Sequence, residues 1–321
     1  MTYTNIPFVP KPVSRIVLGG SGKHFFSGAD VSEIMETALD CGINCVDTAR
    51  EYGKSEETIG KYFRENGRRE DFAVISKCCH PTLAFVQRVG RRAAEDDLKR
   101  SLDTLGTEHI DIYFLHRDNP LVSVGYIAEF MHRFHEEGKI GAFGGSNWTV
   151  KRISELNAYA ESHGLTGFTV SSPHYSLGRQ QRDPWGNGCK TITGAKNAAQ
   201  RAFYEQNQMP LFCWASLCAG MFSGRMKSTD AGQVMKRFGF NAAWGYDCPD
   251  NYERLRRCEQ LSAEKDSTVA QIALAWLLNS SLNTLSIVGG SDPARIRENA
   301  QAAEIRLTDE ERCWLNLGDP L

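Results

Sequence analysis

The sequence lacks any hydrophobic run long enough to cross a membrane. A spanning helix needs about 20 apolar residues, but the longest apolar stretch covers only Val269–Leu278 and is interrupted by Gln271. Residues 1–14 are polar and contain proline, without the apolar core of a secretory signal. We therefore predict neither a membrane segment nor secretion.

The sequence also lacks an excess of charge of one sign. Its 37 Lys and Arg residues are balanced by 39 Asp and Glu residues, which gives a formal net charge of −2. Proteins that bind nucleic acids or anionic membranes carry basic surfaces. The charge balance therefore predicts no nucleic-acid partner and no membrane partner.

Ten cysteines are present, but no two have C-x-x-C spacing. Most lie inside apolar runs, where Cys acts as a small hydrophobic residue, so we expect reduced thiols in a cytoplasmic protein. Cys78, Cys79 and His80 form a cluster. Neighbouring residues of a strand point to opposite faces, however, and no other Cys or His group has zinc-ligand spacing. We predict no metal site.

Short apolar runs typical of strands alternate with helical patterns along the whole chain. The predicted strands are 15–18, 44–47, 73–77, 110–116, 140–146, 168–172, 211–216 and 285–288. The predicted helices are 30–40, 55–65, 91–105, 124–137, 150–163, 196–206, 267–278, 292–302 and 308–317. Eight such alternations predict an α/β protein with a closed (β/α)8 TIM barrel, as a single domain over residues 1–321.

A glycine-rich dinucleotide loop is missing. Residues 20–22 read Gly-Ser-Gly after the first strand, but the third glycine of G-x-G-x-x-G is absent, which argues against an open Rossmann sheet. Two long, aromatic-rich connections, residues 174–193 and 217–250, follow strands 6 and 7, and we expect them to be functional loops. The chain stops after the last predicted helix, so we expect no long C-terminal loop.

Four ionisable side chains stand at or just beyond the ends of three predicted strands: Asp47, Tyr52, Lys77 and His116. The ends of neighbouring parallel strands meet at one face of a barrel, so these groups should share a pocket. An ammonium group lowers the pKa of a nearby phenol from its ordinary value near 10. The pattern suits protonation of a carbonyl oxygen by Tyr52, with Asp47 holding Lys77 and with His116 either orienting a substrate oxygen or sharing the proton.

Further short motifs accompany these residues in a fixed order. They are D-T-A-R-E-Y-G at 47–53, L-H-R at 115–117, G-K-I at 138–140, G-S-N-W at 145–148, Y-S-L at 175–177 and E-N at 298–299. With these motifs the chain resembles the aldo-keto reductase family over nearly its whole length. The resemblance implies an oxidoreductase that interconverts an aldehyde or ketone with its alcohol. It further implies NADP(H) as cofactor, with NAD(H) as the alternative, and Tyr52 as general acid and base.

The resemblance also implies a cofactor site. Ser146 and Asn147 would bind the nicotinamide carboxamide, and Trp214 would stack on the ring. The complete expected set is Gly20, Ser21, Ser146, Asn147, Ser172, Trp214, Leu217, Gly220, Arg295, Glu298 and Asn299. Ser172 replaces the family's usual Gln, and Gly289-Gly290 replace a common Lys-Ser pair. Binding of the 2′-phosphate of NADP(H) is therefore expected to depend on Arg295.

The substrate pocket is predicted from ring side chains, namely Phe25, His80 and Trp148 after predicted strands and Trp185 in a long connection. Aromatic walls suit the apolar face of a ring carbonyl or a sugar derivative. Two other functions remain open on the same barrel. One is a Schiff-base aldolase with Lys77 as nucleophile, and the other is a regulatory subunit that binds the cofactor without turnover. The sequence leaves the oligomeric state open.

Overall fold

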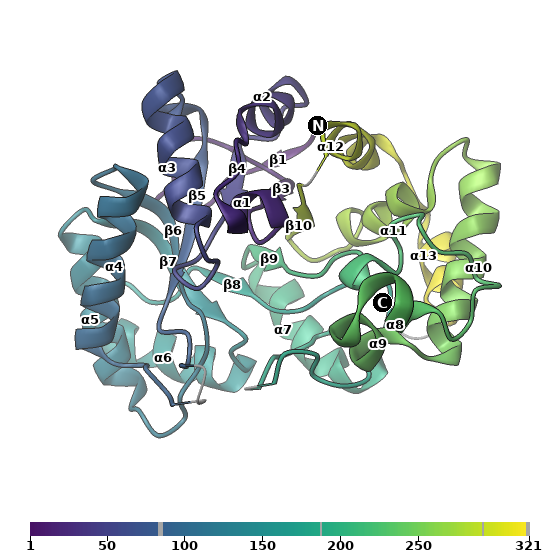
Figure 1. Ribbon diagram of the computed structural model, residues 1–321. Coiled ribbons are helices and arrows are strands. Elements are labelled where there is room, and N and C mark those ends of the chain that lie inside the picture. The colour runs from purple at the N-terminus through teal and green to yellow at the C-terminus, as the bar shows by residue number, and fades with distance from the viewer. Residues whose placement is uncertain (83–85, 187, 291, 319–321) are drawn as a thin grey trace.

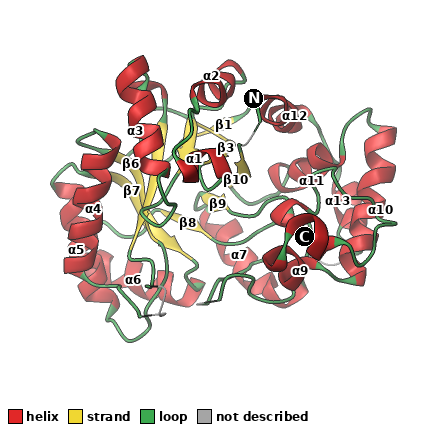
Figure 2. Ribbon diagram, in the orientation of Figure 1, coloured by secondary structure: helices red, strands yellow, loops and turns green. Residues whose placement is uncertain are grey.

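The fold is a closed barrel of eight parallel strands, and the computed structural model describes residues 1–82, 86–186, 188–290 and 292–318. The order around the barrel is β10-β3-β4-β5-β6-β7-β8-β9. These strands are β3 (Ile16–Gly19), β4 (Cys45–Asp47), β5 (Ala73–Cys78), β6 (Ile110–Leu115), β7 (Ile140–Ser146), β8 (Val170–Ser172), β9 (Leu211–Cys213) and β10 (Thr284–Gly289). The predicted (β/α)8 barrel is confirmed, with helices surrounding the central strands (Figures 1 and 2).

The hydrophobic core has two parts because side chains alternate between the two faces of each strand. On β5, Ala73 and Ile75 belong to the cluster inside the barrel, whereas Val74 packs in the cluster between barrel and helices. An N-terminal hairpin, β1 (Tyr3–Thr4) and β2 (Val13–Ser14), precedes the barrel. Ile6 and Val13 of this segment join the interior cluster. The hairpin was not predicted from the sequence.

The helices that cover the barrel largely follow the predicted pattern. They are α2 (Ser32–Asp40), α3 (Ser55–Asn66), α4 (Arg91–Leu105), α5 (Val124–Glu136), α6 (Val150–Ser162), α7 (Ala198–Asn207), α10 (Pro249–Glu264), α11 (Val269–Leu278), α12 (Pro293–Gln301) and α13 (Asp309–Leu315). Thr308 and Glu311 form the capping box that begins α13. No helix in the described residues is long and apolar enough to cross a membrane.

The longest apolar stretch forms α11, which is buried on nearly every side. It packs against β10 of the barrel and against α10 and α12. Thr268 and Gln271 cap its first turn, and the side-chain amide of Gln271 donates to Glu298 O at 3.0 Å. Gln271, the polar residue within the apolar run, therefore accepts a hydrogen bond from a backbone N–H group at the start of α11 and also links α11 to α12.

The two long connections contain structure that the sequence did not reveal. The segment predicted as a loop over 217–250 holds α8 (Val234–Phe238) and α9 (Phe240–Tyr246), and the long helix α10 was missed altogether. α10 begins with Pro249 at its first turn, a position that proline favours. The two connections also touch, because Gln181 N donates to Gly245 O at 2.8 Å and the Arg182 guanidinium lies 4.3 Å from the Trp244 ring.

Short elements complete the chain. They are α1 (Lys23–Ser27) and the single 3-10 turns Arg69–Asp71, Ala195–Asn197, Cys218–Gly220 and Ala302–Glu304. The first of them, α1, follows β3, and the third turn lies in the connection after β9. Both positions are on the side of the barrel where the strands end, which is the face that carries the site described next.

Candidate active site

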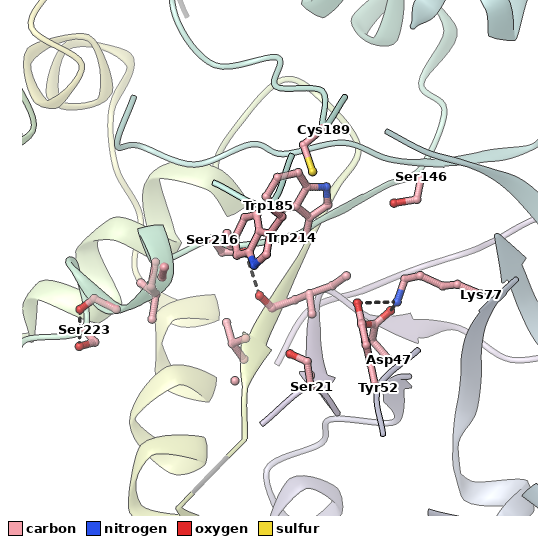
Figure 3. A pocket seen from close by; sticks show the side chains of 18 of the residues that line it. Ser21, Asp47, Tyr52, Lys77, Ser146, Trp185, Cys189, Trp214, Ser216 and Ser223 are labelled. Atoms are coloured by element: carbon pink, nitrogen blue, oxygen red, sulfur yellow. Dashed lines mark hydrogen bonds and ion pairs between the residues drawn. The ribbon is translucent and has the colours of Figure 1, made fainter. Parts of the chain in front are cut away.

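Asp47, Tyr52, Lys77 and His116 line one cavity of about 590 Å³ at the carboxyl ends of the strands. The Lys77 ammonium lies 2.5 Å from Asp47 Oδ1, 2.9 Å from the Thr48 carbonyl oxygen and 3.4 Å from the Tyr52 hydroxyl. Figure 3 shows Lys77 and Asp47 joined by this contact, with Tyr52 beside them. The structure therefore brings the four predicted residues together.

A tight turn after β4 brings Tyr52 over the barrel. Tyr52 N donates to Ala49 O at 3.0 Å, and Ser55 N at the start of α3 donates to Tyr52 O at 2.9 Å. Gly53 has φ +54, and a Cβ atom there would lie 2.9 Å from Phe26 O. Glycine is required at this point because both the backbone conformation and the space exclude a side chain.

The balance of charges in the tetrad favours a protonated Lys77. Burial by itself would lower the pKa of Lys77, but Asp47 and Tyr52 outweigh this effect and raise it above its ordinary value. Burial raises the pKa of Asp47, while Lys77 opposes that rise. The buried pair is thus held by mutual attraction and by the Thr48 carbonyl group, because an unpaired charge at this depth would be costly.

The pKa of Tyr52 lies above its ordinary value, which differs from the sequence-based expectation. Burial raises it, and Lys77 pulls in the expected downward direction without overcoming burial. The physical reason is that the phenolate loses more hydration in this cavity than one ammonium at 3.4 Å returns. Tyr52 is therefore a neutral phenol at neutral pH, which is the form that can give a proton.

His116 is buried next to the tyrosine. Its ring meets the Tyr52 ring edge-on at 5.7 Å and the His80 ring at 4.7 Å. Burial, followed by the charges of Lys77 and Arg117, holds the pKa of His116 well below its ordinary value. Within the described part of the chain its Nδ1 has no hydrogen-bond partner. A neutral imidazole here can donate one N–H group to an oxygen in the cavity.

Ser146 is the last residue of β7, Asn147 follows it, and both line the cavity. Asn147 has φ +64, and its side-chain amide donates to Ser146 Oγ at 3.1 Å and accepts from Lys190 N at 3.1 Å. Ser146 Oγ donates to Ser172 O at 3.1 Å. These bonds fix the two polar side chains at the cavity wall, and their contact with a carboxamide stays a prediction.

Trp214 follows β9 and is held by aromatic neighbours. Its ring lies 4.9 Å from the His174 ring and 5.2 Å from the Trp185 ring. Burial lowers the pKa of His174 to about 3, so this histidine is neutral, and it contacts Thr191 Oγ1 at 2.7 Å. Trp185 and Trp214 lie side by side at the cavity in Figure 3. The two rings meet edge-on at an interplanar angle of 79°, so together they form an apolar corner of the cavity wall.

The far end of the cavity is lined by Leu217, Gly220, Arg295, Glu298 and Asn299, as predicted, and Ser21 also belongs to the lining. Arg225 lies there as well, with its guanidinium 4.8 Å from the Phe238 ring. Burial, followed by the positive charge of Arg295, lowers the pKa of Arg225. Two neighbouring guanidinium groups make this end suited to an anion.

Two predicted cofactor contacts lie outside the lining formed by the described residues. Gly20 N donates to Asp47 O at 2.7 Å, and a Cβ atom on Gly20 would lie 2.7 Å from Ser55 Oγ. Gly20 is therefore needed for close packing beneath the site. Ser172 is fully buried, and its hydroxyl donates to Phe212 O at 2.8 Å. Ser172 lies behind Ser146 and accepts its hydrogen bond, and the short Ser172 side chain does not extend past Ser146 into the cavity.

Two predicted substrate contacts also fall outside that lining. Phe25 is fully buried in the core between barrel and helices. Trp148 is 2% exposed and packs edge-on against Phe168 at 4.9 Å. Both rings are therefore part of the core, where large apolar side chains are most often buried, and their contact with a substrate stays a prediction. His80 and Trp185 do line the cavity, and Trp185 remains 41% exposed.

The sequence reasoning missed a larger set of lining residues. These are Gly19, Glu51, Arg117, Cys189, Ala215, Ser216, Ala219, Ser223, Arg225, Ala270, Ile287, Val288 and Gly289. Six of these thirteen residues adjoin a predicted residue in sequence, so a wider window around each predicted residue would have found those six. Cys189 and Arg225 lie in the long connections, where sequence alone gives no strand end to count from. In the parts of the chain that are described, no three His, Cys, Asp or Glu side chains are placed to hold a metal ion.

The site combines a closed parallel barrel with four ionisable side chains at its open face, and comparison with known proteins identifies the family. The model of the "Aldo/keto reductase family" matches residues 15–312, so the chain belongs to this family. It is 26% identical to the aldo-keto reductase YhdN of Bacillus subtilis, over 98% of this chain and 93% of the relative.

Two further relatives carry different names. A putative voltage-gated potassium channel subunit beta of Schizosaccharomyces pombe is 26% identical, over 93% of this chain and 87% of the relative. A putative aryl-alcohol dehydrogenase of the same organism is 26% identical, over 89% of this chain and 84% of the relative. Family membership supports an oxidoreductase activity, and the finer assignment rests on the site.

Proposed function

We propose that this protein is an NADP(H)-dependent reductase that interconverts an aldehyde or ketone with its alcohol, and that Tyr52 is the proton donor. The observation that carries the proposal is the position of the Lys77 ammonium, 2.5 Å from Asp47 Oδ1 and 3.4 Å from the Tyr52 hydroxyl. This arrangement provides a neutral phenol next to a fixed positive charge. The charge stabilises the phenolate that proton transfer leaves behind.

The cavity fits a nicotinamide dinucleotide. Ser146 and Asn147 present polar side chains beside the Trp214 ring, and Arg225 and Arg295 gather positive charge at the other end. When bound, NADPH would supply a hydride to the carbonyl carbon. Tyr52 would hold the proton for the carbonyl oxygen at its hydroxyl group, and His116 would donate a hydrogen bond to the same oxygen.

The preference for NADP(H) over NAD(H) rests on the two arginines. Arg295 Nε lies 3.9 Å from Asp292 Oδ2, and Arg225 Nε donates to Ser223 Oγ at 3.1 Å. Neither contact neutralises a guanidinium as a close bidentate carboxylate would. A 2′-phosphate between them would relieve their mutual repulsion, which is the physical basis of the proposed preference.

A Schiff-base aldolase on the same barrel is disfavoured by the geometry around Lys77. Such a nucleophile must lose its proton to attack a carbonyl carbon. Here the Lys77 ammonium donates to a buried carboxylate and a carbonyl oxygen, and its pKa is raised. Borohydride trapping of an adduct on Lys77 would contradict this argument.

A regulatory role without turnover is the second candidate, because one relative is named as a channel subunit beta. The two functions separate in one experiment. A panel of aldehydes, ketones and alcohols is tested, and the reaction is followed by the absorbance of NADPH. We expect a carbonyl compound to oxidise NADPH, or an alcohol to reduce NADP⁺ to NADPH. Binding of NADPH without turnover of any carbonyl compound would favour the regulatory role.

A further inference from the structure

Arg117 is a buried cation at the cavity that the proposed reaction does not use. It follows His116 directly, is 7% exposed and lines the cavity. Its Nη1 donates to its neighbour's carbonyl oxygen, His116 O, at 2.9 Å. Its buried Nε has no hydrogen-bond partner in the described residues. A buried guanidinium in this condition is costly unless an anion pairs with it.

The carboxylates around Arg117 are occupied elsewhere. Asp118 accepts from both Nε and Nη2 of Arg152 at 3.1 Å. Asp183 accepts from the backbone N–H groups of Trp185 and Cys189 at 3.0 and 2.8 Å. Glu51 is about half exposed at the cavity mouth and lies 3.9 Å from His80 Nδ1. The described part of the chain therefore leaves the positive charge of Arg117 without a carboxylate partner.

Arg117 lies on the opposite side of the barrel from the proposed phosphate end. It follows β6, whereas Arg295 follows β10, and these two strands are four places apart in the closed ring of eight. Its charge acts on the groups around the reaction centre: burial, followed by Arg117, lowers the pKa of His80. Arg117 thus belongs to the chamber where a substrate would lie, and not to the phosphate-binding end.

Two side chains near Arg117 are uncharged. Burial raises the pKa of Cys189 to about 12, so its thiol stays neutral. His80 is neutral at pH 7 because its pKa is lowered. Cys189 and Trp185 supply apolar wall to the same cavity, and Figure 3 shows the Cys189 thiol beside the tryptophan rings. One planar cation beside apolar walls matches a carboxylate on a carbon skeleton, because guanidinium pairs with carboxylate in a two-point geometry.

We propose that Arg117 binds a carboxylate on the carbonyl substrate, so that the preferred substrates are oxo-acids that carry an aldehyde or ketone at a distance from the carboxylate. This inference rests on the proposed reductase function. A phosphate on the substrate shares the same chemistry. A phosphate dianion calls for more positive charge than one guanidinium group provides, so the test below includes a phosphate compound.

The test compares matched carbonyl compounds with NADPH. 4-Carboxybenzaldehyde and methyl 4-formylbenzoate have the same ring, and the ester is the more electrophilic aldehyde. A higher kcat/KM for the acid therefore reports recognition of the carboxylate. We expect the acid to be preferred by about tenfold or more, the scale of one charge-assisted hydrogen bond. Equal values, or preference for the ester, would overturn the proposal, as would a still higher value for 4-formylphenyl phosphate.

Two variants localise the effect. Arg117→Gln should abolish the preference for the acid while the ester keeps most of its kcat/KM, and Arg117→Lys should retain part of it because the charge remains without the planar fork. Arg225→Gln is the matched control at the other end of the cavity. It should weaken NADPH binding and leave the acid-to-ester ratio unchanged. An unchanged ratio in Arg117→Gln would show that this arginine is structural.

Failure of the proposed function gives a different result. If no carbonyl compound is turned over, binding of benzoate and methyl benzoate to the NADPH complex can be followed by tryptophan fluorescence, since two tryptophans line the cavity. Tighter binding of benzoate that is lost in Arg117→Gln supports the carboxylate site without the reductase. No difference between the two ligands would overturn the carboxylate site itself. Thermal melting of each variant checks that it is folded.

Discussion

The Lys77 ammonium lies 3.4 Å from the Tyr52 hydroxyl and 4.8 Å from the centre of the Tyr52 ring. It is therefore close enough to stabilise a phenolate, although burial keeps the resting tyrosine neutral. This relationship makes Lys77 the group that decides how readily Tyr52 releases its proton. The first predictions test it.

Tyr52→Phe should lower kcat for carbonyl reduction by about 10²–10⁴-fold, the range of general acid catalysis. The ring remains, so the Kd for NADPH, measured by tryptophan fluorescence, should change little. Lys77→Met should also nearly abolish turnover because the phenolate loses its stabilising charge. Asp47→Asn should cause a smaller loss, since Asp47 acts through Lys77. Retention of more than about a tenth of kcat in Tyr52→Phe would exclude this tyrosine as the acid.

The pH dependence follows from the raised pKa of Tyr52. Reduction needs the protonated phenol, so its rate should stay level through neutral pH and fall only as pH rises through the pKa of Tyr52, above the ordinary value near 10. Alcohol oxidation needs the phenolate, so its rate should rise over the same alkaline range. The pKa of Lys77 is raised as well, by Asp47 and Tyr52 against the effect of burial. A reduction rate that falls between about pH 6 and 8 would contradict this assignment.

The sequence predicted the barrel and the tetrad better than the rest of the site. Strand ends are readable because apolar runs stop where the chain leaves the barrel, which placed Asp47, Lys77 and His116 correctly on one face. Which neighbour faces the cavity depends on turn geometry beyond the strand. That is why Ser172 was expected in the lining and Arg117 was not. The helix α10 was missed because the preceding aromatic segment masked its start at Pro249.

Arg225 and Arg295 should together set the cofactor preference. Arg295→Ala and Arg225→Ala should each weaken NADPH binding by about tenfold, the scale of a charge-assisted hydrogen bond, and leave NADH binding nearly unchanged. Isothermal titration with both cofactors measures this difference directly. Arg117→Gln serves as the control, and its ratio of the Kd for NADH to the Kd for NADPH should match that of the parent protein. Equal affinity for NADH and NADPH in the parent protein would refute the proposed preference.

Gly289 and Gly290 differ in what they tolerate. A Cβ atom on Gly289 meets nothing within 4 Å, whereas one on Gly290 would lie 2.1 Å from Leu18 Cδ1. Gly289→Lys should therefore fold normally and tighten NADPH binding about two- to fivefold, the scale of an exposed ion pair. Gly290→Ala should lower the free energy of unfolding by about 1–3 kcal/mol through overpacking. Urea unfolding and NADPH titration of both variants separate the two effects. Weaker NADPH binding in Gly289→Lys would show that the phosphate lies elsewhere.

Trp148 and Trp185 should separate stability from substrate binding. Trp148 is buried against Phe168, and its ring lies 5.3 Å from the Arg152 guanidinium. Trp148→Ala should therefore lower the free energy of unfolding by about 3–5 kcal/mol, as expected for loss of a core aromatic residue. Trp148→Phe should recover much of it.

Trp185, by contrast, is 41% exposed and lines the cavity beside Trp214. Trp185→Ala should raise the KM for ring carbonyls several-fold, because an apolar wall is lost, while the midpoint of thermal unfolding changes little. An unchanged Kd for NADPH would show that Trp185→Ala affects substrate binding and not cofactor binding. If Trp185→Ala matches the parent on every active carbonyl but melts much earlier, this tryptophan only packs the long connection onto the barrel, and the apolar wall of the pocket is formed by other residues.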